Sequence, residues 1–265
     1  MAIITVSGGV GLTMAGTMVA GATKSYAAAV LGDSPIAYWR CGESAGPTLA
    51  DSSGNGFTAT ENGDPMMYGE PSLISAPDAV TAVEGNGVAA DHWTFGTNAT
   101  LEPTVAVTME AWFFPDTTND AIIQYGSASA SDFSGYKLFY GFGSNRFRWY
   151  VGTSDGPNNN ANNAAYIETP ASFPPGSTYH VVATYTSGSM IVYVNGTSVA
   201  TGTKTGTIKY TDVSSTAPTG VIGNEIFNGV VQGATALDGT IGEVAIYDTV
   251  LSPGRVSVHY DLGTL

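Results

Sequence analysis

The C-terminal quarter of the chain contains the pattern that most limits its possible folds. Residues 237–248 read LDGTIGEVAIYD, an Asp-Gly turn followed by spaced apolar residues, which predicts a β-strand. Ser252 follows where a helix N-cap is expected, with Pro253 at the first helical position. This order predicts a closing strand that is covered by a short C-terminal helix.

A second segment shows the alternation of a β-hairpin. In residues 179–185, Tyr, Val, Ala and Tyr alternate with His, Val and Thr, and the pair Ser187-Gly188 separates this run from the apolar residues 190–194. Further Asn-Gly pairs at 55–56, 62–63, 86–87 and 195–196 are candidate two-residue hairpin turns. Turns at such short spacing predict an all-β sandwich.

Several of these segments resemble the signatures of laminin-G-like (concanavalin A-like) jelly-roll domains. The resembling segments, in chain order, are 25–31, 35–40 and 51–56 at the opening, 107–112 (VTMEAW), the hairpin strands 180–185 and 190–196, and the closing motif. In that motif the chain keeps Gly239, Ile241, Glu243, Val244, Tyr247, Leu251, Ser252 and Pro253. It departs at Gly242, where the family usually has Asp.

The resemblance implies an all-β fold, a two-sheet antiparallel jelly-roll sandwich with an N-terminal arm and a short C-terminal helix. The jelly roll is expected over residues 25–265, after an arm at residues 1–24. Because this fold occurs in lectins, hydrolases and inert spacers, it does not by itself imply a function.

Composition excludes some partners. The chain has 265 residues, 43% of them hydrophobic, which is enough for a core. Its 22 acidic and 8 basic side chains give a net charge of −14. A field of that sign repels nucleic acid and anionic membrane surfaces, so neither is expected as a partner.

The first 24 residues predict an assembly arm. No Lys or Arg precedes Lys24, and glycines interrupt the apolar stretch, which argues against both a signal peptide and a transmembrane span. The apolar residues expected to form two short arm strands are Ile3, Ile4, Val6, Leu12 and Met14. We expect this arm to anchor the domain to a larger assembly, with packing on its own domain as the alternative.

The carboxylates do not follow the pattern of a glycosidase. Retaining glycosidases require two carboxylates about 5 Å apart, commonly on alternate residues of one strand. Glu110 has no acidic residue two positions away, and Glu243 is followed by Ala245 at that spacing. The single cysteine, Cys41, lies far in sequence from every histidine. We therefore expect no catalytic residues.

Calcium is the one cofactor that the resemblance suggests. Jelly rolls of this class often hold one Ca²⁺ at a sheet rim, and hard cations need several oxygen ligands. The candidate ligands are Asp51, Glu84, Asp238 and Asp248. Each is also explained as an ordinary turn or surface residue, and Gly242 replaces the Asp that the family usually has.

A hairpin at residues 136–151 is the best candidate for binding a ligand. It contains Lys137, Arg146 and Arg148, three of the eight basic residues. Strand alternation places Phe147, Trp149 and Val151 in the core and Arg146, Arg148 and Tyr150 on the opposite face. Donors beside an aromatic ring suit a glycan or an acidic partner, and Tyr140 and Trp93 are expected to add stacking surface. The alternative is a solvated sheet face.

Two functions follow from these observations. The arm followed by one laminin-G-like domain resembles the arrangement of minor tail or capsid-decoration proteins of actinobacterial phages. This resemblance implies a homo-oligomeric or multicopy, non-enzymatic protein of the virion surface. It is expected to contact other virion proteins through its arm and to bind host-surface glycans weakly. The alternative is a secreted or surface bacterial carbohydrate-binding module, with an extracellular location.

Overall fold

A computed structural model describes residues 25–88, 90–118, 120–129, 132–141, 144–155, 166–211 and 217–265. The predicted arm, with Ile3, Ile4, Val6, Leu12 and Met14, lies outside the described residues. None of the described helices is long and apolar enough to cross a membrane.

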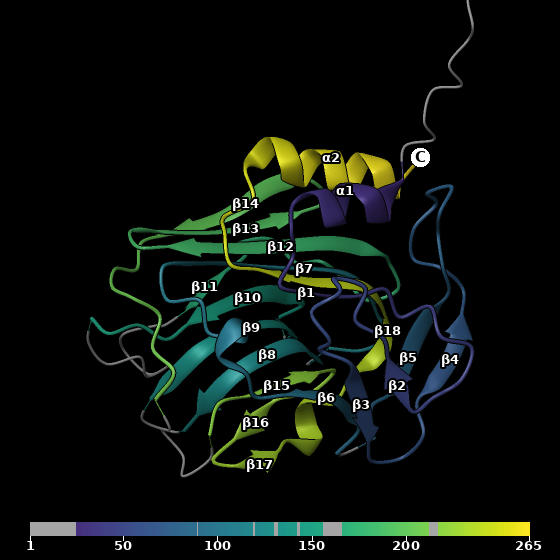
Figure 1. The fold of residues 1–265 in the computed structure, drawn as a ribbon, viewed down its shortest axis with the longest axis horizontal. Coiled ribbons are helices and arrows are strands. Elements are labelled where there is room, and N and C mark those ends of the chain that lie inside the picture. Colours follow the sequence, from purple (N-terminus) through teal and green to yellow (C-terminus); the bar gives the residue numbers. More distant parts are fainter. Residues whose placement is uncertain are drawn as a thin grey trace, which may run out of the picture.

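The described chain forms two antiparallel sheets that pack face to face (Figure 1). The first, sheet A, contains in spatial order β14 (Thr197–Gly202), β13 (Ser189–Val194), β12 (Tyr179–Thr186), β7 (Ala106–Pro115), β18 (Asp238–Tyr247), β5 (Ala82–Asn86) and β4 (Met67–Glu70), with β1 (Ala37–Trp39) paired to β18. The second, sheet B, contains β11 (Tyr166–Glu168), β10 (Arg146–Val151), β9 (Phe133–Gly141), β8 (Asp120–Ala128), β15 (Thr219–Ile222), β6 (His92–Gly96), β3 (Ala59–Asn62) and β2 (Thr48–Leu49). The jelly-roll sandwich predicted from the sequence is confirmed.

The core between the sheets follows from the alternation of side chains along each strand. On β7, Val107, Met109, Ala111 and Phe113 point into this core, while Trp112 points outward. β7 is nevertheless buried on both faces, because two helices cover the outer face of sheet A. This explains why its sequence reads as nearly continuous apolar residues.

The helices come from the two ends of the described chain. α1 (Tyr26–Gly32) begins at the N-cap Ser25, whose hydroxyl accepts a hydrogen bond from Ala28 N at 3.0 Å. α2 (Pro253–Gly263) begins at the predicted N-cap Ser252, with Pro253 in its first turn. Figure 1 shows both helices lying over sheet A. The helix α2 was predicted, whereas α1 was not.

Smaller elements complete the molecule. They are a two-stranded ribbon of β16 (Ile226–Phe227) and β17 (Val230–Val231), and the 3-10 turns η1 (Ala99–Leu101) and η2 (Gly233–Thr235). The ribbon lies on the opposite side of the molecule from the helices (Figure 1).

The predicted turns are correct only in part. Asn195 and Gly196 join β13 to β14 with φ angles of 51° and 75°, as a tight hairpin turn requires. In contrast, residues 62–63 and 86–87 lie where the chain passes from one sheet to the other, so they form no hairpin.

Candidate functional site

The candidate site lies on the outer face of sheet B, where basic and aromatic side chains gather. As predicted, Phe147, Trp149 and Val151 of β10 point into the core. Tyr150 instead joins an outer cluster with Phe133 and Phe139 of β9. We call the side of sheet B that carries Lys137, Arg146, Arg148, Tyr150 and Tyr166 the aromatic-basic face. Lys137 and Tyr150 are buried within it, whereas the two arginines and Tyr166 are partly exposed.

Strand register brings these residues together. Lys137 of β9 pairs with Tyr150 of β10, and Tyr150 pairs in turn with Tyr166 of β11. On the other side, Lys137 pairs with Gln124 of β8. Directly paired residues in an antiparallel sheet point to the same face, so these four side chains form one row across four strands.

Glu168 holds the two arginines of the face. Arg146 Nη1 lies 2.9 Å from Glu168 Oε1, and Arg148 donates to the other carboxylate oxygen. Arg148 also lies over the Tyr166 ring, 5.1 Å from its centroid. Although burial works against it, these guanidinium contacts lower the pKa of Glu168 below its usual value. The arginines are therefore held in place rather than free to turn in solvent.

Beside this face is a recess of about 260 Å³ between sheet B and the β16–β17 ribbon. Residues from four strands and three connecting segments line it: Ala128, Ser129, Asp132, Phe133, Lys137, Tyr150, Glu225, Phe227 and Gln232. Gln232 Nε2 donates to the carbonyl oxygens of Phe227 at 3.2 Å and Val230 at 2.7 Å, which fixes the ribbon wall. The recess thus combines aromatic walls with charged and amide groups, as ligand pockets do.

Lys137 is the charged centre of the recess. It is only 4% exposed, its ammonium group forms an ion pair with the buried carboxylate of Glu225, and it lies 4.4 Å from the centroid of the Tyr150 ring. A second ion pair at the rim joins Lys209 Nζ to Asp132 Oδ2 at 2.5 Å. The positive and negative charges at the recess are therefore matched in pairs.

Two residues predicted to provide stacking surface do not do so. Tyr140 points into the core and donates a hydrogen bond from its hydroxyl to Phe173 O at 2.6 Å. Trp93 is also buried in the core, where its Nε1 donates to the Tyr68 hydroxyl at 2.8 Å. Tyr140 is three positions from Lys137 on one strand, so alternation sends the two side chains to opposite faces.

The four candidate calcium ligands lie in three different places. Asp51 accepts backbone N–H groups from Tyr38 and Ser53 on one oxygen and from Phe57 on the other, which makes it a turn residue. Asp248 lines a shallow hollow beside residues 99–105. Glu84 and Asp238 are on the adjacent strands β5 and β18. Asp238 pairs with Asn86, and Glu84 is two residues before Asn86, so Glu84 and Asp238 point to the same face. The structure therefore does not bring the four residues together.

Acidic residues near Glu84 and Asp238 repel one another. Burial, followed by the charges of Glu70, Asp116 and Asp238, raises the pKa of Glu84. Burial is also the largest cause that raises the pKa of Asp120 to about 8, with Asp238 and Asp116 adding to it. Among the described residues, no group of three or more His, Cys, Asp or Glu side chains is arranged to hold a metal ion.

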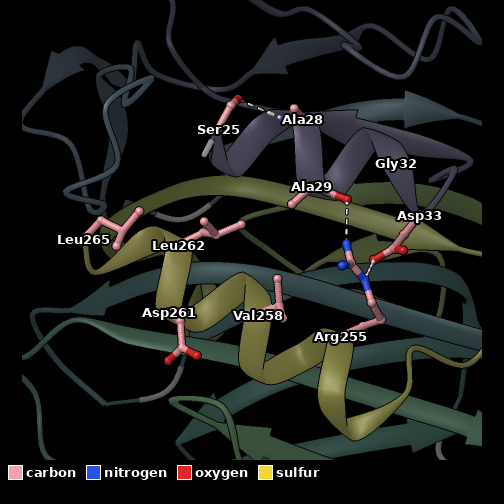
Figure 2. Close-up of a pocket in the computed structure, with 10 residues that line it drawn as sticks. All are labelled: Ser25, Ala28, Ala29, Gly32, Asp33, Arg255, Val258, Asp261, Leu262 and Leu265. Atoms are coloured by element: carbon pink, nitrogen blue, oxygen red, sulfur yellow. Dashed lines mark hydrogen bonds and ion pairs between the residues drawn. The ribbon is translucent and has the colours of Figure 1, made fainter. Parts of the chain in front are cut away.

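A larger, more open groove of about 750 Å³ lies between the helices α1 and α2. Figure 2 shows Ala28 and Ala29 of α1 on one side and Val258 and Leu262 of α2 on the other. Arg255 crosses one end, donating to Ala29 O at 3.1 Å and to Asp33 Oδ2 at 2.8 Å. This groove has no aromatic wall among its described lining residues and is a less suitable sugar site than the recess.

Sequence reasoning missed a buried network beneath the helices. Glu110 of β7 is fully buried, and its carboxylate accepts hydrogen bonds from the Tyr26 hydroxyl at 2.8 Å and the Tyr247 hydroxyl at 2.7 Å. His180 Nε2 lies 2.8 Å and His259 Nδ1 3.0 Å from the same carboxylate. Although burial alone would raise the pKa of Glu110, the two histidines hold it well below its usual value. The network connects α1 and α2 to sheet A, and its Glu110, His180 and His259 side chains are fully buried.

A family model described as "Concanavalin A-like lectin/glucanases superfamily" matches residues 85–257, about two thirds of the chain. This range includes the recess and the aromatic-basic face. No curated protein sequence matches the chain.

Solved structures show the same fold at low sequence identity. The fourth domain of an extracellular arabinanase from Geobacillus stearothermophilus, solved in complex with arabinotriose, has a TM-score of 0.57 and 17% identity, covering 87% of this chain and 98% of that one. A structure of botulinum neurotoxin type C, whose cell entry depends on two ganglioside molecules, has a TM-score of 0.54 and 14% identity over 89% of this chain and 53% of that one. A Trypanosoma rangeli sialidase has a TM-score of 0.52 and 16% identity over 86% of this chain, but this chain spans only 32% of the sialidase.

Proposed function

Because the chain belongs to the concanavalin A-like lectin/glucanases superfamily, we propose that it is a non-enzymatic, lectin-like domain that binds carbohydrate at the recess and the aromatic-basic face. The observation that carries this proposal is the row of Lys137, Tyr150 and Tyr166 beside the recess. Sugar rings pack their apolar faces on aromatic side chains, while charged and amide groups accept from or donate to their hydroxyls. The partly exposed Tyr166, together with the recess that Lys137 and Tyr150 line, offers both kinds of contact.

The carboxylates at the recess favour binding over hydrolysis. Glycoside hydrolysis needs one carboxyl group to donate a proton and another to attack or to activate water. Glu225 and Asp132 are each ion-paired with a lysine, so both carboxylates are already engaged within the protein. Two of the similar structures belong to proteins that act on or bind glycans, an arabinanase and a botulinum neurotoxin. They support carbohydrate as the class of ligand and do not support a reaction.

The proposal predicts binding to at least one glycan on an array and its loss on changing the arginines. We expect the double variant Arg146→Ser/Arg148→Ser to reduce binding at least tenfold, because two held donors beside Tyr166 are removed, a loss of about 1.4 kcal/mol or more. Binding would be measured by array and by titration calorimetry of the best ligand. The thermal unfolding temperature should change little, because surface ion pairs contribute little to stability.

A matched control is Arg255→Ser, which changes an arginine ion-paired on the helical side of the molecule. It should bind like the wild-type protein. Equal binding by the wild type and the Arg146→Ser/Arg148→Ser variant would show that the aromatic-basic face is not the glycan site.

We further propose that the domain is displayed in many copies on a virion surface, with residues 1–24 as its anchor. The support is geometric. Ser25, where the described chain begins, caps α1, and the recess lies between sheet B and the β16–β17 ribbon. Figure 1 shows α1 and that ribbon on opposite sides of the molecule. An anchor at Ser25 would leave the recess pointing away from the particle. Display in many copies would compensate for weak binding at each site.

Deletion of residues 1–23 tests the anchoring role. The truncated protein should stay folded, with a thermal unfolding temperature close to that of the full-length protein because Ser25 and α1 are retained, but it should no longer join particles. Incorporation of the truncated protein at the wild-type level would contradict the role of the arm. If intact mass shows that the natural protein begins near Thr23, the alternative, an exported carbohydrate-binding module, is favoured instead.

A further inference from the structure

We propose that the recess binds one uncharged pyranose ring, and that it discriminates against acidic sugars such as sialic and uronic acids. This inference rests on the proposed function, because it names the class of sugar that the same site takes. Three observations carry it: the size of the recess, its aromatic walls and the pairing of its charges.

The size of the recess limits the ligand to one ring. Its volume of about 260 Å³ is slightly below the usual range of about 300–1,000 Å³ for small-molecule pockets. A longer saccharide must therefore extend out of it. The aromatic-basic face provides the exit, since Tyr150 at the recess pairs with Tyr166 on the next strand and their ring centroids are 4.8 Å apart.

The walls suit the apolar faces of a pyranose. Phe133 and Tyr150 line the recess with ring centroids 6.0 Å apart, and Phe227 lines the ribbon side. Rings on two sides of a narrow space favour a flat, compact ligand with C–H groups on its faces. The polar groups of the recess, from Asp132, Lys137, Glu225 and Gln232, then face the hydroxyl groups at the edge of the sugar.

The charges oppose an acidic ligand. Lys137 is engaged by Glu225 and Lys209 by Asp132, so both lysines that the structure describes at the recess already have a carboxylate partner. A carboxylate in the recess would instead approach Glu225 and Asp132, and it would enter against the field of a protein with a net charge of −14. Sugar hydroxyls, by contrast, can donate to both carboxylates and accept from the lysine.

A comparison of paired glycans tests the inference. The wild-type protein would be titrated with a set of neutral oligosaccharides and with the same oligosaccharides carrying a uronic acid in place of the terminal hexose, at about 0.15 M salt, so that the two members of a pair differ only in the carboxylate of the terminal ring. We expect the neutral member of a binding pair to bind at least tenfold more tightly. Tighter binding of the acidic member would overturn the inference and leave the proposed function intact. If no member binds, the proposed function itself fails.

Variants then place the sugar in the recess. The double variant Lys137→Met/Glu225→Gln removes both charges together and should bind the neutral glycan at least tenfold more weakly, while unfolding at a temperature close to that of the wild type. Because a folding defect could imitate a binding defect, Phe227→Ala on the ribbon wall is a second variant. It should also weaken neutral glycan binding, whereas Val258→Ala in the groove between the helices should not. Unchanged binding in both recess variants would place the sugar elsewhere.

Discussion

Glu110→Gln is expected to lower the free energy of unfolding by about 3–5 kcal/mol, because it removes one partner of a buried charge network. The carboxylate of Glu110 is an acceptor for Tyr26, Tyr247, His180 and His259. In the glutamine variant an NH2 group takes the place of one carboxylate oxygen. This NH2 group is a donor that faces other donors, so the buried hydrogen-bond donors around position 110 lose an acceptor. For a chain of this size the unfolding temperature should fall by about 6–20 °C. Chemical and thermal unfolding would measure both changes.

The pH dependence separates loss of the charge network from simple loss of packing. Burial alone would lower the pKa of His259, but Glu110 and Asp33 raise it above its usual 6.5. A histidine whose pKa is raised in the folded state stabilises that state below about pH 6.5, the pKa of the unfolded chain. This contribution is lost as the pH rises through the higher pKa of the folded state. The stability difference between the wild type and Glu110→Gln should therefore narrow above pH 6.5.

The control for this prediction is Glu70→Gln on the edge strand β4, where the side chain is half-buried. It should change the free energy of unfolding by less than about 0.5 kcal/mol. A loss of stability in Glu110→Gln as small as that of the control would show that the network does not hold the helices on sheet A.

Lys137→Met is expected to destabilise the protein by about 3–5 kcal/mol, since it leaves the buried carboxylate of Glu225 without its ion-pair partner. The double variant Lys137→Met/Glu225→Gln should recover most of this loss, because replacing both members of a buried pair removes the unpaired charge. A double-mutant cycle on the free energy of unfolding measures the coupling between the two residues.

The matched control is the ion pair between Lys209 and Asp132, whose side chains are 21% and 31% exposed. Lys209→Met should cost no more than about 1 kcal/mol, because solvent screens the pair. Additive effects of Lys137→Met and Glu225→Gln would show that the two charges do not stabilise each other.

The faces of the strands could be read from the sequence because side-chain direction depends only on local alternation. This placed Arg146, Arg148 and Tyr150 on one face and Trp149 in the core before any strand was assigned a neighbour. The same rule, applied to Lys137 and Tyr140, would have excluded Tyr140 from that face. The N-cap of α1 at Ser25 was also a readable signal, since a serine precedes an alanine-rich run.

Contacts between distant segments could not be read in this way. Glu225 lies 88 positions after Lys137, and it reaches the recess only because the chain after β15 returns across sheet B. His180 and His259 are far apart in sequence, and both reach Glu110 because β12 pairs with β7 and α2 lies over that pair. The order of the strands in the sheets determines these contacts, and no local sequence pattern indicates that order.

The two-sheet sandwich followed from the family resemblance, whereas the residues themselves determined the closing strand, the capped C-terminal helix and the side chains of residues 146–150 that face away from the core. These features depend on the period of two along a strand and on the chemistry of turns and caps, which act over a few residues. Only the tertiary structure decided that Lys137 is paired and buried, that the candidate calcium ligands lie apart and that Glu110 is an acceptor for four donors. Those properties depend on which strands become neighbours, and burial and charge pairing arise only after that choice is made.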